Sequence, residues 1–415
     1  MPACGLDFGT SNTTLGDAAH GAPRLAALEG EHVTIPSAIF FDWSGEPTFG
    51  RAAMATYIEG TQGRLMRSLK SVLGTSLADE TTAVGRRRLR FRDVIAIYVK
   101  EVKRRAEAHA GVAFDAVVHG RPVHFVDGNP AGDRAAENML RGIAQDAGFR
   151  DISFQYEPIA AALDYERQIS REEIALIADI GGGTSDFSII RLSPERHKKV
   201  ERADDILAND GVRIGGVDFD RVLSLSRLMP LLGYGSPTTR PGRDVPGGVF
   251  HDLATWSNIN RLYNDKTHRD LRAMRRDALQ PELIDRMMHA LDRELGHTLA
   301  MEIEAAKIAL SQRDDILLDL AMIEGGLDLS ITRDEFATDT ARLSGRIGER
   351  IDACLRMAGL KKEAVGSLFL TGGSTRILHV AQAITSLMPQ ARIVEGDTFG
   401  AVGAGLTIEA ARRYG

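Results

Sequence analysis

The sequence predicts an α/β protein built from two similar halves, and three observations lead to this prediction. Residues 174–178 form a continuous apolar run, which is typical of a strand buried on both faces. The run leads into the motif Asp179-Ile-Gly-Gly-Gly-Thr-Ser-Asp186, and residues 187–192 have the composition of a returning strand. Residues 3–16 repeat this strand–turn–strand order around Asp7-Phe-Gly-Thr10, so each half offers one hairpin to a shared cleft.

The glycine triplet of the central motif favours a phosphate-binding site over a plain hairpin. Consecutive glycines permit positive φ angles and let the backbone approach a ligand closely. Successive backbone N–H groups in such a turn form a concave site for an anion. Asp179 and Asp186 flank the triplet, and carboxylates beside a phosphate site usually indicate a hydrated Mg²⁺ ion. A structural hairpin needs only one or two glycines.

Length and composition place the chain among globular proteins. Its 415 residues suffice for two or more domains, and 43% of them are hydrophobic and 26% charged. The net charge of −6 gives no reason to expect nucleic acid or an anionic membrane as a partner. The densest basic run, residues 86–90, lacks interleaved aromatic residues, so we expect a solvated strand or loop there.

The cysteines and the length of the apolar runs indicate the cellular compartment in which the protein is expected. Cys4 and Cys354 are far apart and fit no metal-ligand spacing, which favours a reducing compartment. The first motif is reached by Asp7, which leaves no room for a signal peptide, and no apolar run has the length of a membrane span. We therefore expect a cytoplasmic protein.

The other elements follow from hydrophobic periodicity and from turn residues. In the first half we expect short strands at 33–35, 38–41 and 115–119, and helices at 52–59, 91–110 and 129–148. In the second half we expect a glycine-rich turn at 211–216, a surface loop at 233–250, helices across 254–312 and at 334–358, strands within 317–331 and at 365–370, and a closely packed small-residue helix from 401.

Three sets of polar residues allow both a functional and a structural interpretation. Lys70 ends a basic stretch whose spacing alone favours a solvated amphipathic helix. Glu157 precedes a proline at a helix start, where it either caps the helix or positions water at the cleft. Glu304, Lys307 and Ser311 lie on one helical face, which an exposed Glu–Lys pair would also explain.

With these motifs in order, the chain resembles the nucleotide-binding domain of the DnaK-type, seventy-kilodalton heat-shock chaperones, in the actin–hexokinase superfamily. The resemblance covers nearly the entire chain. The main matching motifs are Asp7-Phe-Gly-Thr10, Glu157-Pro-Ile-Ala-Ala-Ala-Leu163, Asp179-Ile-Gly-Gly-Gly-Thr-Ser-Asp186, Gly372-Gly-Ser-Thr-Arg376 and residues 397–405. The short YegD-like branch fits best, because it shares Gly120-Arg-Pro122, Phe154-Gln-Tyr-Glu-Pro158 and Leu228-Met-Pro-Leu-Leu-Gly233.

The resemblance implies an actin-like ATPase fold of two lobes, each with a mixed sheet flanked by helices and an inserted subdomain. The first lobe would combine a core of residues 1–30 and 111–173 with an insert at 31–110. The second would combine a core of residues 174–213 and 339–415 with an insert at 214–338. The nucleotide would lie at the bottom of the cleft between the lobes.

The resemblance also implies ATP or ADP with Mg²⁺ as ligands, and a role for each matching residue. Asp7, Asp179 and Asp186 would hold the hydrated metal. Lys70 would reach the γ-phosphate and Glu157 would orient the attacking water, with Asp179 and Thr184 completing the catalytic set. The phosphates would be cradled by Gly9, Thr10, Ser11, Asn12, Gly181, Gly182, Gly183 and Thr184. The nucleoside would be held by Gly215, Gly216, Glu304, Lys307, Ser311, Gly372, Gly373, Ser374, Arg376 and Asp397.

The chain departs from the family pattern at three places. Ile308 stands where the family commonly has an arginine on the adenine, so we expect weaker adenine affinity. Ser11 and Asn12 replace the commoner residues of the first hairpin, a mild change. The sequence ends at Gly415, and we expect no counterpart of the family's linker, peptide-binding sandwich and helical lid.

Three functions remain open at this point. The first is a slowly hydrolysing chaperone-like ATPase, whose nucleotide state would open and close the cleft for a co-chaperone, exchange factor or client protein. The second is a small-molecule kinase of the same superfamily, for which no general-base aspartate can be assigned outside the phosphate motifs. The third is a nucleotide-switched scaffold or filament protein. No P-loop, zinc-protease motif or nucleophile elbow supports another enzyme class.

Overall fold

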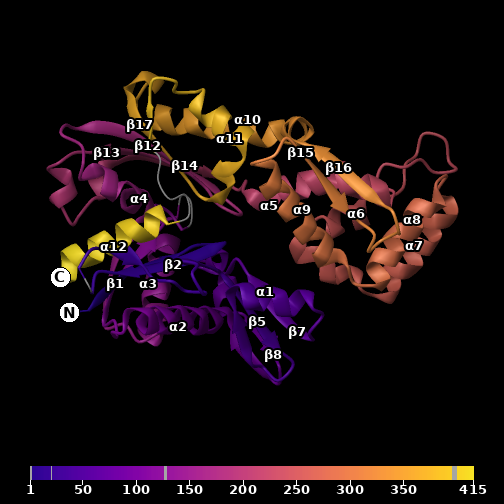
Figure 1. Ribbon diagram of the computed structural model, residues 1–415, viewed down its shortest axis with the longest axis horizontal. Helices are drawn as coiled ribbons and strands as arrows, with labels where there is room; N and C mark the ends of the chain where they lie inside the picture. Colours follow the sequence, from indigo (N-terminus) through magenta and orange to yellow (C-terminus); the bar gives the residue numbers. More distant parts are fainter. Residues whose placement is uncertain (1, 20, 126–128, 395–399) are drawn as a thin grey trace. The chain divides into compact units, whose positions relative to one another are not determined.

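The computed structural model describes residues 2–19, 21–125, 129–394 and 400–415 (Figure 1). The chain forms two compact units, which are described separately below. The first unit comprises Met1–Val212, Arg350–Thr375 and Thr385–Gly415, and the second comprises Arg213–Glu349 and Arg376–Ile384. The α/β fold class predicted from the sequence is confirmed, whereas the division into four subdomains stays a prediction.

The first unit contains two mixed sheets. In the first sheet the strands follow the order β11-β10-β1-β2-β3, and β4 also pairs with β2. Their bounds are β1 Ala3–Phe8, β2 Asn12–Asp17, β3 Arg24–Leu25, β4 Thr34–Pro36, β10 Ala116–Arg121 and β11 Asp151–Tyr156. The central strand β1 is antiparallel to β2 and parallel to β10.

The second sheet of this unit repeats the arrangement in the order β14-β13-β12-β17-β18. Its strands are β12 Glu173–Ile180, β13 Ser185–Leu192, β14 Ile206–Val212, β17 Val365–Thr371 and β18 Arg392–Val394. The central strand β12 is antiparallel to β13 and parallel to β17, as β1 is to β2 and β10. The similarity of the two hairpins that the sequence predicts is therefore confirmed.

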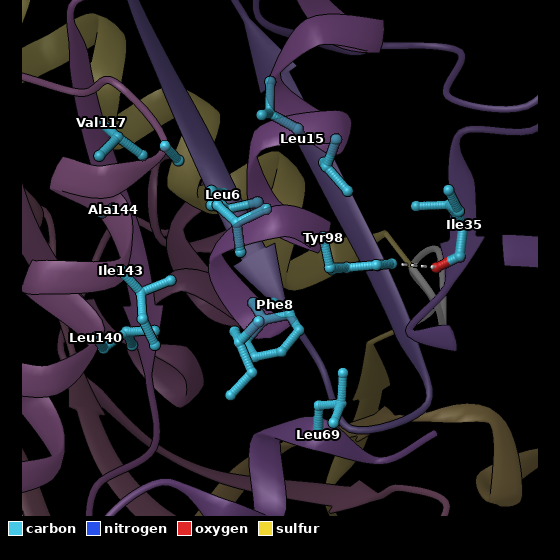
Figure 2. Close-up of a cluster of buried hydrophobic side chains, with 14 of the residues drawn as sticks. Leu6, Phe8, Leu15, Ile35, Leu69, Tyr98, Val117, Leu140, Ile143 and Ala144 are labelled. Atoms are coloured by element: carbon cyan, nitrogen blue, oxygen red, sulfur yellow. Dashed lines mark hydrogen bonds between the residues drawn. The ribbon is translucent and has the colours of Figure 1, made fainter. Parts of the chain in front are cut away.

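Helices α2 (Phe91–Ala110) and α3 (Pro130–Asp146) supply most of the helical side chains of the core built on the first sheet. Figure 2 shows Leu6, Phe8 and Leu15 of the sheet among side chains from these helices. The buried Tyr98 hydroxyl donates to the backbone oxygen of Pro36 at 3.0 Å, which satisfies the one polar atom of that side chain.

Helices α4 (Glu157–Glu166) and α12 (Ala401–Tyr414) pack against each other, and α12 also lies on β1 and β10. The contact is close because α12 carries small residues at the interface. A Cβ atom on Gly405 would lie 1.8 Å from the backbone oxygen of Ala160. The tight packing expected for this helix is confirmed.

Replacing Gly405 by alanine should lower the free energy of unfolding by about 1–3 kcal/mol, since the added methyl group forces two helix backbones apart. Gly142→Ala in α3 is the matched control, because a Cβ atom there meets nothing within 4 Å. The control should stabilise the protein by about 0.5–1 kcal/mol through helix propensity. Urea unfolding of both variants would test this, and equal stabilisation by the two substitutions would contradict the packing argument.

The segment between β4 and α2 contains several short elements. They are β5 Ala38–Asp42, β6 Pro47–Phe49, α1 Gly50–Ile58, β7 Gly63–Arg67, the 3₁₀ turn η1 Leu69–Val72, β8 Thr81–Val84 and β9 Arg87–Arg90. The amphipathic helix considered for residues 64–70 is wrong, because residues 64–67 pair with β5 as strand β7. Exposed strand at residues 87–90 confirms the prediction for the basic run.

The second unit is mostly helical. Its elements include α5 Gly216–Leu223, α6 Gly248–Leu253, α7 Asp265–Asp277, α8 Pro281–Asp292, α9 Gly296–Leu310 and α11 Leu378–Thr385, together with the hairpin of β15 Asp315–Asp319 and β16 Asp328–Thr332. Helix α10, Arg333–Met357, begins in this unit and ends in the first. The helices expected across 254–312 and the strands expected within 317–331 are confirmed.

Two further expectations can be compared with the structure. Cys4 and Cys354 are both buried and form no disulfide in the described chain. None of the helices among the described residues is long and apolar enough to cross a membrane.

Candidate functional site

The central hairpin places its two aspartates side by side. Asp179 on β12 lies directly opposite Asp186 on β13. Asp179 is also paired with Thr371 on β17, and Asp186 with Gly211 on β14, so the four residues form one row across four strands. A Cβ atom on Gly211 would lie 3.0 Å from the Asp186 Oδ1 atom. The turn expected at 211–216 is therefore wrong for Gly211, which lies within a strand and leaves room for the Asp186 carboxylate.

The glycine triplet forms the turn of this hairpin. The Gly181 amide donates to the Thr184 carbonyl at 2.9 Å, and the Thr184 hydroxyl donates to Asp186 Oδ2 at 3.0 Å. A Cβ atom on Gly182 would lie 2.0 Å from the Ser11 hydroxyl oxygen. The turns of the two hairpins are thus in contact within the first unit, as the shared site requires.

The first hairpin is held by a residue that the sequence did not single out. The Gly9 amide donates to the Asn12 carbonyl at 3.0 Å and closes the turn around Thr10 and Ser11. The Ser37 hydroxyl donates to the Gly9 carbonyl at 2.7 Å, and the Ser37 amide donates to the Ser11 carbonyl at 2.8 Å. Because Ser37 lies far away in sequence, only its place beside strand β4 reveals this supporting role.

Lys70 and Glu157 form an ion pair, with 2.6 Å between Nζ and Oε1. Only 12% of the Lys70 side chain and 15% of the Glu157 side chain are exposed. Lys70 is carried by η1, which follows Ser68 in the left-handed conformation (φ 56°, ψ 33°). Glu157 is the first residue of α4, and its carboxylate accepts a hydrogen bond from Lys70.

The buried carboxylates raise one another's pKa. Burial raises the pKa of Asp7 to about 7, Glu157 and Asp179 add to this effect, and Lys70 opposes it. Burial and the neighbouring Asp186 raise the pKa of Asp179 to about 7. Burial lowers the pKa of Lys70, but Glu157 and Asp7 outweigh this and raise it. The site therefore holds more negative charge than one lysine neutralises, and a cation would fit it.

The arrangement of the carboxylates suits magnesium held through water. Among the described residues no three His, Cys, Asp or Glu side chains are grouped as a ready-made metal-ligand set. Mg²⁺ does not require one, since it keeps several waters and binds one or two carboxylates together with phosphate oxygens. Asp7, Asp179 and Asp186 could hold a hydrated Mg²⁺ ion in this way.

A pocket opens beside these carboxylates. Its lining residues are Pro122, Val123, Glu157, Pro158, Ala161, Ile177, Asp179, Asp186, Ser188, Asn209, Thr371 and Val402. The sequence analysis missed Ser188 and Asn209, which are paired across β13 and β14 with 2.9 Å between Asn209 Nδ2 and Ser188 Oγ. Ser188 could have been found, because residues two apart on a strand share a face with Asp186.

The loop after β17 contacts the central hairpin. Gly372 has a φ angle of +80°, and a Cβ atom there would lie 2.4 Å from the Ile180 carbonyl oxygen. The Ser374 hydroxyl, two residues after Gly372 and directly after Gly373, donates to the Gly181 carbonyl at 3.0 Å. The structure thus brings this loop to the glycine triplet of the central hairpin.

The remaining predicted nucleoside residues that the structure describes belong to the second unit. Lys307 on α9 is 8% exposed, and its Nζ lies 2.8 Å from Asp220 Oδ1 and 3.3 Å from the Gly216 carbonyl oxygen. An exposed Glu–Lys pair is therefore the wrong description of Lys307, which connects α9 to the start of α5. The roles predicted for Gly215, Glu304, Ser311 and Arg376 stay predictions, and Asp397 lies outside the described residues.

Comparisons with known proteins point to one family. The family model described as "Hsp70 protein" matches residues 80–226 and 281–412. The chaperone protein HscA homolog of Aromatoleum aromaticum is 26% identical over 427 residues, which cover 98% of this chain and 57% of that protein. HscA of Citrobacter koseri is 26% identical over 97% of this chain and 57% of its own length. HscA of Salmonella typhimurium is 26% identical over 98% of this chain and 58% of its own length. The chain thus spans less than 60% of the length of these relatives, and none of the three tests the YegD-like assignment.

Proposed function

Because the chain belongs to the Hsp70 family, we propose that it binds ATP with Mg²⁺ and hydrolyses the nucleotide slowly. The supporting observation is the buried Lys70–Glu157 ion pair beside the aspartates of two touching hairpins. This arrangement supplies a cation, a carboxylate and an anion-binding turn within one part of the first unit. Phosphoryl transfer needs these groups, since positioning and charge neutralisation provide most of its catalysis.

The proposed division of labour follows the chemistry of each side chain. Lys70 would leave Glu157 when nucleotide binds and donate hydrogen bonds to the terminal phosphate. Glu157, released from that pair, would accept a proton from the attacking water and hold it in line. Bound Mg²⁺ would neutralise charge on the phosphate oxygens. Asp179 and Asp186 would keep it there, and the Thr184 hydroxyl would orient Asp186.

The two hairpin turns would cradle the phosphates. The Gly9 and Gly181 amides close the turns, so the donors to phosphate would be the N–H groups of the residues that follow them within residues 9–12 and 181–184, because turns of this kind concentrate donors around an anion. The close approach of Gly182 to Ser11 supports this proposal, because two touching turns could contact the same ligand.

The nucleoside end of the ligand gives a separate prediction. Glu304→Ala should weaken the binding of ATP, ADP and AMP alike, by about tenfold for the loss of one hydrogen bond to the ribose. Glu302→Ala on the same helix is the control and should leave all three affinities unchanged. Titration of each nucleotide by calorimetry measures this, and an effect confined to ATP would remove Glu304 from the nucleoside site. With Ile308 on the adenine side, we expect all three affinities to be modest.

The nucleotide state would then set the affinity for a protein partner, such as a co-chaperone, an exchange factor or a client, in the cytoplasm. Single-turnover hydrolysis with Mg²⁺ tests the enzymatic part of this proposal. Slow phosphate release by the pure protein would support an autonomous ATPase. Tight ATP binding without turnover would favour the kinase instead, and ATP-dependent sedimentation of large assemblies would favour the filament protein.

A further inference from the structure

The most exposed large hydrophobic side chain of the described chain is a tryptophan. Trp43 is 70% exposed and lies in the turn between β5 and β6. Tryptophan is costly to leave in water and is enriched at the centres of protein interfaces. An exposed tryptophan therefore calls for an explanation, and its surroundings supply one.

Hydrogen bonds hold the turn that carries Trp43. The Asp42 carboxylate accepts hydrogen bonds from the Ser44 amide at 2.9 Å, the Ser44 hydroxyl at 2.7 Å and the Glu46 amide at 2.9 Å. The Gly45 amide donates to the Asp42 carbonyl at 3.0 Å. A side chain held by such a turn loses little backbone entropy on binding, which favours affinity.

A second hairpin brings arginines to this turn. Strands β8 and β9 are joined by Gly85 and Arg86, and a Cβ atom on Gly85 would lie 2.9 Å from both the Gly45 amide nitrogen and the Ser44 carbonyl carbon. The two turns are thus in backbone contact. Strands β5 and β8, which lead into these turns, are neighbours in Figure 1. Arg87 pairs with Val84, so it shares the face of the hairpin that meets Gly45.

The arginines of the β8–β9 hairpin differ in whether they have partners within the chain. Arg86 and Arg87 are exposed, and neither has an ion-pair partner among the described residues. By contrast, Arg88 on the opposite face donates to the Thr81 hydroxyl at 2.9 Å and to the Thr81 carbonyl at 3.1 Å. The Asp42 Oδ1 atom accepts three hydrogen bonds within its own turn, and among the described residues neither Asp42 nor Glu46 forms an ion pair with Arg86 or Arg87.

We propose that Trp43, Arg86 and Arg87, together called the Trp–Arg surface, bind an acidic and partly apolar segment of a partner protein. The indole would cover an apolar side chain of the segment, and each guanidinium would form paired hydrogen bonds with a carboxylate. Nucleic acid is a poorer fit, because two phosphate contacts on a chain of net charge −6 give little affinity. The small size of the surface fits a transient interaction.

The probe is a fluorescein-labelled peptide of alternating aspartate and leucine, followed by anisotropy with the full chain. We expect micromolar binding that weakens at least tenfold in Trp43→Ala and in the double variant Arg86→Glu/Arg87→Glu. Arg88→Gln, on the other face of the same hairpin, is the matched control and should bind as the wild type does. None of these positions belongs to the proposed nucleotide site, so ATP hydrolysis should be unchanged, and its rate also reports that each variant is folded.

Three results would overturn the proposal. Equal binding by the wild type and both variants would place the peptide elsewhere. Equally tight binding of single-stranded DNA of the same charge, insensitive to Trp43→Ala, would reduce the surface to nonspecific electrostatics. Self-association in sedimentation velocity that disappears in Trp43→Ala would make a second copy of this chain the occupant. A failure of ATP hydrolysis in the wild type would instead concern only the proposed nucleotide site.

Discussion

Lys70→Ala should reduce the rate of ATP hydrolysis by about 100-fold, while the affinity for ATP should stay within a few-fold of the wild type. The expected loss is large because Lys70 is the cation that opposes the upward pKa shifts of both Asp7 and Asp179. Its hydrogen bonds to the terminal phosphate would form most strongly as charge moves in the transition state. ATP affinity is spread over two hairpins and the nucleoside residues, so one contact contributes little to it.

Single-turnover hydrolysis and equilibrium binding should be measured together at saturating Mg²⁺. Saturation matters because removing Lys70 makes the carboxylate site more negative, which favours protonation of Asp7 and Asp179 in competition with the metal. Lys266→Ala, on the exposed face of α7, is the control. Glu157→Gln should lose as much activity as Lys70→Ala, and the double variant little more, since the pair acts as a unit. Equal losses of ATP binding and hydrolysis in Lys70→Ala would contradict the proposed role of Lys70 at the terminal phosphate.

The sequence predicts the hairpins of this site well, because each is a local feature. An apolar run, a glycine triplet and flanking acids lie within 15 residues of one another, and the strands β12 and β13 form where these patterns predict. The repeat of the pattern around Asp7 also predicts that two similar sheets exist. Local periodicity likewise predicts α2, whose apolar positions are buried as expected.

What the sequence could not predict depends on contacts between distant segments. Spacing alone favoured a helix before Lys70, and the structure has strand β7 there, because pairing with β5 outweighs a weak local preference. Three contacts of this kind join residues far apart in the chain. They are the hydrogen bond from Ser37 to Gly9, the hydrogen bond from Asn209 to Ser188, and the ion pair of Lys307 with Asp220. The Trp–Arg surface is of the same kind, since the basic run has no aromatic residue of its own and receives one from another hairpin.

Without Mg²⁺, Asp7→Asn should make the protein more stable at pH 7.5, and the same substitution should abolish hydrolysis of ATP. A carboxyl group with an ordinary pKa near 3.9 is raised to about 7 in the folded chain, so the unfolded state loses its proton first as the pH rises. The free energy of unfolding therefore falls between about pH 4 and pH 7, and the full cost is present above pH 7. Asparagine cannot ionise and removes this cost.

The stabilisation should be about 1–2 kcal/mol at pH 7.5, less than a three-unit shift implies, because Asp7 and Asp179 repel each other and share the effect. Thermal melts of wild type and variant from pH 4.5 to 8 in EDTA measure it. The difference should shrink as the pH falls through 7 and be smallest at pH 4.5, since it vanishes only below about pH 4, where the carboxyl is protonated in the unfolded chain as well, and Asp204→Asn on the surface should show no difference at any pH. Mg²⁺ with ATP should reverse the order, raising the melting temperature of the wild type but not of Asp7→Asn. A variant less stable than the wild type at pH 7.5 in EDTA would mean that the Asp7 carboxylate stabilises the empty site, which would contradict a site built to receive a cation. A site that binds Mg²⁺ and nucleotide needs carboxylates that are not neutralised within the protein, and these carboxylates lower the stability of the empty protein.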